Sequence, residues 1–288
     1  METVFSRITI IGLGLMGGSW GLALRERGIA ARRVGCDKPE VLERAVAAGV
    51  VDEGSSDAAT AIGDADLVIL ATPVGSILDL LPLLKSAAPP RALITDVGST
   101  KRLVCQRARE ILGDDPLFLG GHPLAGKERS GLDNASARLF EGARYVLTPL
   151  LPNHLDDARV KAFSALIETV GAKPFVTEAS THDRAVAFLS HLPQLVSSGL
   201  ASMIAEQGAE DFLPLDLAAS GFRDVTRLAE SPYGVWRDIC LTNIENIQSA
   251  LDALIEKLEA MKLHLSDREL ERDFIKAFKL REKLREVQ

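Results

Sequence analysis

Hydrophobic and polar residues follow two different patterns along the chain, and the change falls near residue 177. In the first part, short runs of β-branched and other apolar residues alternate with stretches whose apolar positions recur at helical spacing. Strands are expected at 7–12, 32–37, 65–73, 91–99, 117–123, 143–150 and 172–178. Helices are expected at 14–28, 38–49, 75–88 and 156–170. Strands that alternate with helices in this way predict an α/β fold with a doubly wound parallel sheet.

The second part of the chain has a helical pattern only. Segments 178–207 and 235–265 carry apolar residues at helical spacing. The tail, 266–288, mixes both charge signs and is expected to form a solvated helix. We therefore predict two domains, an α/β domain over 1–176 and an all-helical domain over 177–288. Because long apolar helix faces need a covering surface, the helical domain is expected to form a two-fold homodimer.

Composition and charge narrow the choice of protein class. A net charge of −7 does not fit a broad nucleic-acid-binding surface, which needs clustered lysine and arginine. The longest apolar runs are too short to span a bilayer, and the strand expected at 7–12 leaves no room for a signal peptide. The cysteines follow no disulfide or metal spacing, and the histidines form no H-E-x-x-H motif. We therefore expect a cytoplasmic protein without a metal site, a nucleic-acid partner or a membrane segment.

The first expected strand leads directly into a glycine motif. Gly12, Gly14 and Gly17 form a complete G-x-G-x-x-G that follows a strand and opens a helix. In Rossmann-type domains these glycines allow the tight turn, the approach of a pyrophosphate and close helix packing. Asp37 ends the next strand, where an acid binds a free ribose 2′-hydroxyl and repels a 2′-phosphate, so NAD is favoured over NADP. The expected cofactor-binding residues are Gly12, Gly14, Leu15, Met16, Gly17, Asp37, Thr72 and Pro73.

A histidine lies in a glycine-rich loop, "FLGGHPLAGKERSG", over 118–131. Ligands of open α/β sheets bind beyond the carboxyl ends of the strands, so His122 is expected on the cofactor side of the sheet. The glycines allow a ligand to approach the backbone, and Pro123 fixes the turn. Because an imidazole titrates near neutral pH, His122 is a candidate acceptor for a hydroxyl proton during hydride removal.

Several motifs together resemble those of the prephenate/arogenate (cyclohexadienyl) dehydrogenases of tyrosine biosynthesis. They are "IGLGLMGGS", "DVGSTK", "GGHPLAGKERSG", "THDRAVAFLSHLPQ" and "SGFRDVTRLAESPYGVW", in the family's order and over nearly the full chain. The resemblance implies an NAD-dependent oxidative decarboxylation, in which hydride leaves a cyclohexadienol ring and the ring carboxylate departs as carbon dioxide. Aromatisation drives this reaction, so the protein's work is positioning and charge control.

The resemblance also implies roles for individual residues. His122 resembles the residue that deprotonates the ring hydroxyl, and Ser99 is similar to the serine that holds that hydroxyl and the histidine. Arg227 resembles the arginine that binds a substrate carboxylate, for which a bidentate guanidinium is suited. The expected substrate-binding residues are Arg227, His191, Gln194, Glu128, Arg223 and Trp236.

Segment 178–207 raises two further expectations. Pro193 cannot donate a hydrogen bond to the carbonyl of Leu189, so the helix is expected to kink beside the site. His182 and Asp183 are interpreted as a structural polar contact near the start of this helix.

The substrate is left open between prephenate and arogenate. Many relatives read "SHLPH" where this chain has Gln194, which is neutral and excludes neither a keto group nor an ammonium. We favour prephenate, with arogenate or dual specificity as the alternative, and expect any inhibition by tyrosine to act at the active site. Two rival classes are a β-hydroxyacid dehydrogenase and a non-catalytic NAD-sensing module. The first needs a lysine motif that the chain does not contain, and the second does not need His122, Ser99 and Arg227 together.

Overall fold

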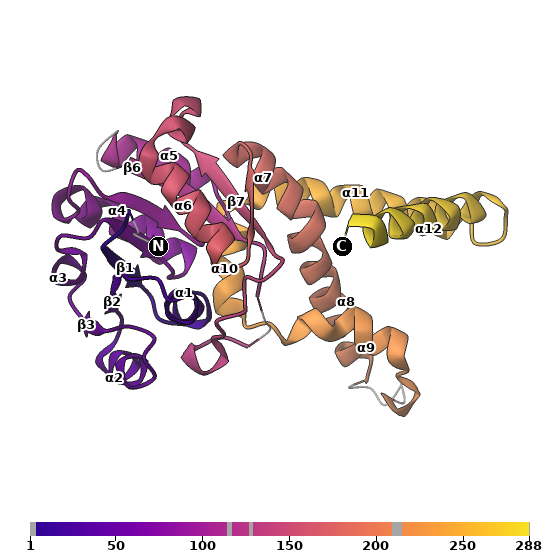
Figure 1. Cartoon of the computed structure of the whole chain (residues 1–288). Coiled ribbons are helices and arrows are strands. Elements are labelled where there is room, and N and C mark those ends of the chain that lie inside the picture. Colours follow the sequence, from indigo (N-terminus) through magenta and orange to yellow (C-terminus); the bar gives the residue numbers. More distant parts are fainter. Residues whose placement is uncertain (1–3, 114–116, 127–128, 209–214, 288) are drawn as a thin grey trace.

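The structure, a computed structural model, describes residues 4–113, 117–126, 129–208 and 215–287. Its first part is a sheet covered by helices on both faces, and its second part is a set of helices that extends away from one edge of the sheet (Figure 1). This arrangement confirms the predicted fold class, with one correction to the direction of the strands that is given below.

Eight strands form one sheet in the order β3-β2-β1-β4-β5-β6-β7-β8. They are β1 (Arg7–Ile11), β2 (Arg32–Cys36), β3 (Glu53–Ser55), β4 (Leu67–Leu70), β5 (Leu93–Asp96), β6 (Leu117–Pro123), β7 (Arg144–Pro149) and β8 (Lys173–Val176). The helices of this part are α1 (Leu15–Glu26), α2 (Pro39–Ala47), α3 (Ala58–Ile62), α4 (Val74–Ala87), α5 (Arg102–Leu112) and α6 (Ala158–Thr169). The strand order reverses at β1, as in doubly wound sheets, so the carboxyl ends of β1 and β4 lie at the switch point where ligands bind.

The sheet differs from the prediction in two places. Strand β7 pairs with β6 in the antiparallel direction, whereas the other strand pairs are parallel, so the sheet is mostly parallel and the direction of β7 was not predicted. The connection between the two strands contains only the short 3₁₀ turn Leu132–Asn134 among its described residues, and an antiparallel neighbour needs no crossover helix. Strand β3 and helices α3 and α5 were not among the predicted elements; β3 has the sequence EGS and carries no hydrophobic pattern.

The core consists of two apolar clusters on the two faces of the sheet. Alternate residues of β4 divide between them: Leu67 and Ile69 belong to one cluster, Val68 and Leu70 to the other. On the first face Trp20 of α1 packs in an aromatic group, with its ring centroid 5.9 Å from that of Phe163. This double layer fixes the sheet, and with it the positions of the loops at its carboxyl edge.

The second part consists of helices from Ala179 onward. They are α7 (Ala179–Val186), a π-helical turn (Ala187–His191), α8 (Leu192–Gly208), α9 (Ser220–Thr226), a 3₁₀ turn (Arg227–Glu230), α10 (Tyr233–Thr242), α11 (Ile244–Leu263) and α12 (Glu269–Val287). The π-helical turn ends two residues before the proline at position 193, and it breaks the α-helical pattern where a kink was predicted.

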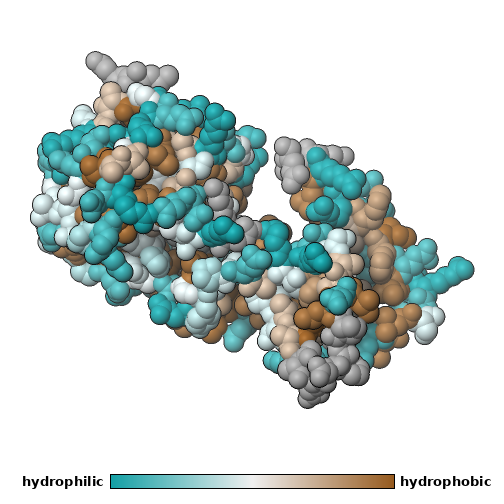
Figure 2. All heavy atoms as spheres, turned by 90° about the horizontal axis from the view of Figure 1, so that it is seen from below, coloured by the Kyte–Doolittle hydropathy of each residue, from teal (hydrophilic) through white to brown (hydrophobic). Residues whose placement is uncertain are grey.

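Helices α11 and α12 form a protruding arm (Figure 1). The ion pair between Lys257 and Asp273 joins the two helices. Both helices keep large apolar side chains exposed, and Figure 2 shows hydrophobic residues gathered on the surface of the helical part. The exposed large apolar residues of these two helices are Ile244, Ile255, Leu258, Leu263, Phe274, Ile275, Phe278, Leu280 and Leu284. Among the described residues, none of the helices is both long enough and apolar enough to span a bilayer.

Candidate active site

A cavity of about 1000 Å³ lies between the carboxyl edge of the sheet and the helices of the second part. Its walls come from the start of α1, from the ends of β4, β5 and β6, and from α7, the π-helical turn and α10. The predicted site residues that line it are Leu15, Met16, Thr72, Pro73, Ser99, His122, His191 and Trp236. The sheet and the helical part therefore share one site.

The glycine turn fits a dinucleotide. Gly12 has a φ of 92°, and a Cβ on Gly17 would lie 1.9 Å from the carbonyl oxygen of Gly12, so both glycines are needed for the turn itself. A Cβ on Gly14 would meet no atom within 4 Å. Helix α1 has no side-chain cap and no acidic residue in its first turn, so its N-terminal N–H groups are free to bind a pyrophosphate.

Asp37 lies beside this turn, directly after β2. One of its carboxylate oxygens accepts a hydrogen bond from the backbone N–H of Leu13 at 2.6 Å, and the other accepts from the N–H of Lys38 at 2.7 Å. The carboxylate is therefore fixed at the carboxyl end of β2, where a ribose hydroxyl is bound in folds of this kind.

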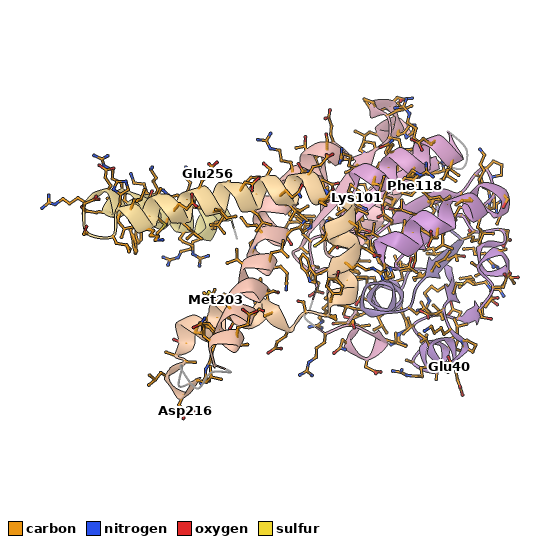
Figure 3. The ribbon with its side chains drawn as sticks, turned by 180° about the vertical axis from the view of Figure 1, so that it is seen from behind. Glu40, Lys101, Phe118, Met203, Asp216 and Glu256 are labelled. Atoms are coloured by element: carbon orange, nitrogen blue, oxygen red, sulfur yellow. The ribbon has the colours of Figure 1, made fainter. Side chains whose placement is uncertain are left out.

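A fully buried ion pair connects the two loops that carry Ser99 and His122. The Asp96 carboxylate accepts from the N–H of Gly98 at 2.9 Å and from the N–H of Gly121 at 3.0 Å, and it also pairs with the ammonium of Lys101. Both ionic side chains are 0% exposed, and Lys101 lies where the sheet meets the helical part (Figure 3). The same carboxylate binds the glycine next to Ser99 and the glycine next to His122. The position of the serine turn is therefore fixed relative to the strand that carries the histidine.

His122 is the first member of a row of three polar side chains. Its Nδ1 lies 2.8 Å from Nε2 of His182, and Nδ1 of His182 lies 2.8 Å from Oδ1 of Asp183. His182 and Asp183 belong to α7 and are buried, whereas His122 is half-buried at the cavity. The interpretation of His182 and Asp183 as a local contact missed this link, since the sequence does not show which loop α7 would face.

The surroundings of the two cavity histidines favour their neutral forms. Burial away from water lowers the pKa of His122 well below its ordinary value, and the neighbouring groups His182, Lys101 and His191 lower it further, because each disfavours a positive charge on His122. Burial likewise lowers the pKa of His191 to about 4, although Asp183 partly opposes this effect. A neutral His122 has a lone pair with which to accept a proton.

His191 and Trp236 lie against each other in the cavity wall. Their rings meet edge to face, with centroids 5.8 Å apart. Nδ1 of His191 lies 3.3 Å from Nδ2 of Asn243, and the same amide donates to the carbonyl of Asp183 at 2.8 Å. The imidazole is therefore held by the residue that precedes α11 while its ring faces the cavity.

The remaining predicted substrate residues lie elsewhere or outside the described chain. Arg223 and Arg227 are exposed on α9 and the following 3₁₀ turn, and neither lines the cavity. Gln194 is buried and donates to the carbonyl of Leu228 at 2.7 Å, so it fixes the turn that carries Arg227. Glu128 lies outside the described residues.

Two arginines that the sequence did not single out line the cavity. They are Arg129, in the loop after β6, and Arg144, at the start of β7. The antiparallel pairing of β6 and β7 brings Arg144 beside the histidine loop, where Leu124 donates its N–H to the Arg144 carbonyl. Their guanidinium groups make the cavity suitable for an anionic ligand.

A Rossmann-type sheet with an open glycine turn and a buried polar histidine row at one cavity defines a dinucleotide-binding oxidoreductase. Residues 20–176 match the family described as "Prephenate dehydrogenase, nucleotide-binding domain", and residues 178–280 match its "dimerization domain". The chain belongs to the prephenate dehydrogenase family. This finding confirms the predicted family and enzyme class, and it places the exposed apolar helices in a dimerization domain.

Individual relatives agree with this assignment. The chain is 35% identical over 280 residues to prephenate dehydrogenase of Bacillus subtilis (strain 168), covering 95% of this chain and 74% of that protein. It resembles the structure of A. aeolicus prephenate dehydrogenase in complex with hydroxyphenyl propionate and NAD+, at 30% identity, a TM-score of 0.89 and 100% coverage of both chains. It also resembles Synechocystis arogenate dehydrogenase, at 31% identity, a TM-score of 0.80 and coverage of 96% and 99%.

Proposed function

We propose that the chain catalyses the NAD-dependent oxidative decarboxylation of prephenate to 4-hydroxyphenylpyruvate. The observation that carries this proposal is His122, which sits at the cavity between the glycine turn and the helical part with a neutral imidazole. When bound, NAD supplies the acceptor for the hydride. Gly14 and the N-terminus of α1 would hold its pyrophosphate, and Asp37 would bind its ribose and so select NAD over NADP.

The residues of this chain then act on the ring hydroxyl. His122 accepts the hydroxyl proton, while Ser99 binds the same oxygen. As the proton leaves, the carbinol carbon loses its hydride and the bond to the ring carboxylate breaks, releasing carbon dioxide and an aromatic ring. The protein supplies orientation and charge balance for these bond changes.

The charges at the cavity favour prephenate, which carries two carboxylates and no ammonium. The described cavity lining includes Arg129 and Arg144 but no carboxylate side chain that would pair with the ammonium of arogenate. We propose that Arg227 and Arg223 also bind substrate, with Gln194 fixing the turn that carries Arg227. Arogenate or dual specificity is the second candidate, because the chain resembles an arogenate dehydrogenase over almost its whole length.

The test is NADH formation by the purified chain with NAD and equal concentrations of prephenate or arogenate. Turnover of prephenate at the greater kcat/KM supports the proposal, and greater turnover of arogenate would transfer it to the second candidate. Absence of turnover with both substrates, while NAD still binds, would refute the reaction. The same assay tests whether tyrosine inhibits in competition with prephenate, as we propose for a ligand of the same site.

We further propose a division into domains 1–176 and 177–288, a two-fold homodimer and a cytoplasmic location. The last strand ends at Val176, and the exposed apolar arm supports self-association. Free cysteines at positions 36, 105 and 240 support a reducing compartment.

A further inference from the structure

The row formed by His122, His182 and Asp183 carries an inference that rests on the proposed function. The two hydrogen bonds of the row are both 2.8 Å long; the first joins β6 of the sheet to α7 of the helical part, and the second lies within α7. His182 is 3% exposed and Asp183 is 0% exposed. Water therefore does not compete for these two side chains, and each must bond inside the protein.

The Asp183 carboxylate is held in one orientation by the backbone. Its Oδ1 accepts from the N–H of Lys101 at 2.7 Å, and its Oδ2 accepts from the N–H of Arg102 at 2.9 Å, at the start of α5. These donors and the N-terminal end of the helix stabilise a negative charge there. A carboxylate can only accept, so the Nδ1 of His182 must carry a proton and donate to it.

This constraint propagates along the row. A neutral His182 that is protonated on Nδ1 has a lone pair on Nε2, and its Nε2 then accepts from Nδ1–H of His122. His122 is consequently protonated on Nδ1, which leaves the lone pair on its Nε2. The tautomer of His122 is thus set through His182 by Asp183, which does not line the cavity.

We propose that His182 and Asp183 are positioning residues that fix His122 in the Nδ1–H tautomer and take up the charge that forms on it. The substrate O–H bond breaks and its proton bonds to Nε2 of His122. The Nδ1 proton of His122 then moves to Nε2 of His182, and the resulting imidazolium lies against the Asp183 carboxylate. One proton enters the row at His122 and one positive charge ends on His182, so no further reactant is needed.

Other charged groups lie near the row, but the proposed proton path does not run through them. Lys101 and His191 lie close enough to disfavour a positive charge on His122. The Lys101 ammonium is itself paired with Asp96. Asp183 is therefore the carboxylate that compensates a proton on the row, and its contact runs through His182.

The experiment compares His182→Leu with His182→Gln. Leucine removes the acceptor for Nδ1–H of His122, whereas the glutamine amide oxygen can reach the position of Nε2 and accept the same hydrogen bond. We expect kcat with prephenate to fall by about 100-fold in H182L, within the range of general-base catalysis, while KM and the Kd for NAD change less than about threefold. H182Q is expected to recover at least about tenfold of that loss, but not full activity, because an amide cannot take the relayed proton.

Ring ¹⁵N NMR of the chain without substrate gives a readout that a merely structural role would not move. The His122 signal, assigned with His122→Asn, should report Nδ1–H in the unaltered chain and in H182Q, and the other or a mixed tautomer in H182L. Equal losses of kcat in both variants with an unchanged His122 tautomer would overturn the proposal. So would an H182L variant with undiminished kcat. The tautomer is measured without turnover, so failure of the proposed reaction would appear separately, as a native chain inactive toward prephenate.

Discussion

Replacing Lys101 by methionine is expected to destabilise the fold. The change removes a fully buried ammonium and leaves the Asp96 carboxylate without a counter-charge. Breaking a buried ion pair from one side costs about 3–5 kcal/mol. Asp96 keeps hydrogen bonds from the N–H groups of Gly98 and Gly121, so we expect the lower end, about 3 kcal/mol. For a chain of this size such a loss corresponds to a fall in Tm of roughly 6–12 °C.

The measurement is urea unfolding of the unaltered chain and the K101M variant, followed by the fluorescence of the buried Trp20. The double variant D96N/K101M is neutral at both positions and is expected to recover part of the loss, because the single amide oxygen can accept from only one of the two backbone N–H groups at a time. Arg107→Met is the matched control, because Arg107 and Glu110 form a solvent-exposed pair within one helix, whose removal should change stability little. A K101M loss no larger than that control, or a double variant no more stable than K101M, would refute the argument.

Four other substitutions probe the glycine turn, the pH dependence and the start of α4. Gly14→Ala is expected to leave Tm unchanged and to raise the Kd for NAD at least about tenfold. Gly17→Ala should instead lower Tm, because its Cβ would meet the backbone. Calorimetry measures Tm and a titration with NAD measures Kd, so the two effects can be distinguished. Acid should destabilise the chain through His191, because the pKa of this imidazole is lowered on folding. Below pH 6.5 the unfolded chain therefore binds a proton that the folded chain does not bind. Up to about 3 kcal/mol of the free energy of unfolding is lost as the pH falls from 6.5 to about 4. His191→Phe should flatten this part of the pH profile, and an unchanged slope would contradict the assignment. Asp238→Ala removes the acceptor for the N–H of Gly75 at the start of α4, and should lower the free energy of unfolding by about 1–3 kcal/mol in the same urea assay; a loss below about 0.5 kcal/mol would count against it.

The sequence predicted most elements because their hydrophobic periodicity reflects burial. The strand expected at 117–123 coincides with β6, and helices α1 and α6 lie within their expected ranges. Strand β3 was not predicted, because a three-residue edge strand without apolar side chains shows no hydrophobic periodicity. The antiparallel direction of β7 was not predicted, because hydrophobic periodicity indicates which face of a strand is buried and not the direction in which the strand runs.

The site was predictable only where a local motif fixes a local conformation. The glycine turn could be placed because its geometry and its chemistry lie within a short stretch, from Gly12 to Gly17. His182 could not be connected to His122, since the contact spans 60 positions and depends on the angle at which α7 crosses the sheet edge. Gln194 was expected at the substrate, but its amide is bonded to the Leu228 carbonyl, a partner that no motif reveals.

Both parts of the molecule hold the cavity histidine, so relative motion of the two parts acts directly on it. The backbone beside His122 is tied to Asp96 in the sheet, while its imidazole is tied through His182 to Asp183 in the helical part. Asp183 is in turn bonded to the N–H groups at the start of α5, so the path returns to the α/β part. The bond between the two imidazoles is the single hydrogen bond that His122 makes among those described for its side chain, so the helical part holds the imidazole through this contact. On the proposed mechanism, the tautomer of the proton acceptor is therefore set by a contact between the two parts of the molecule.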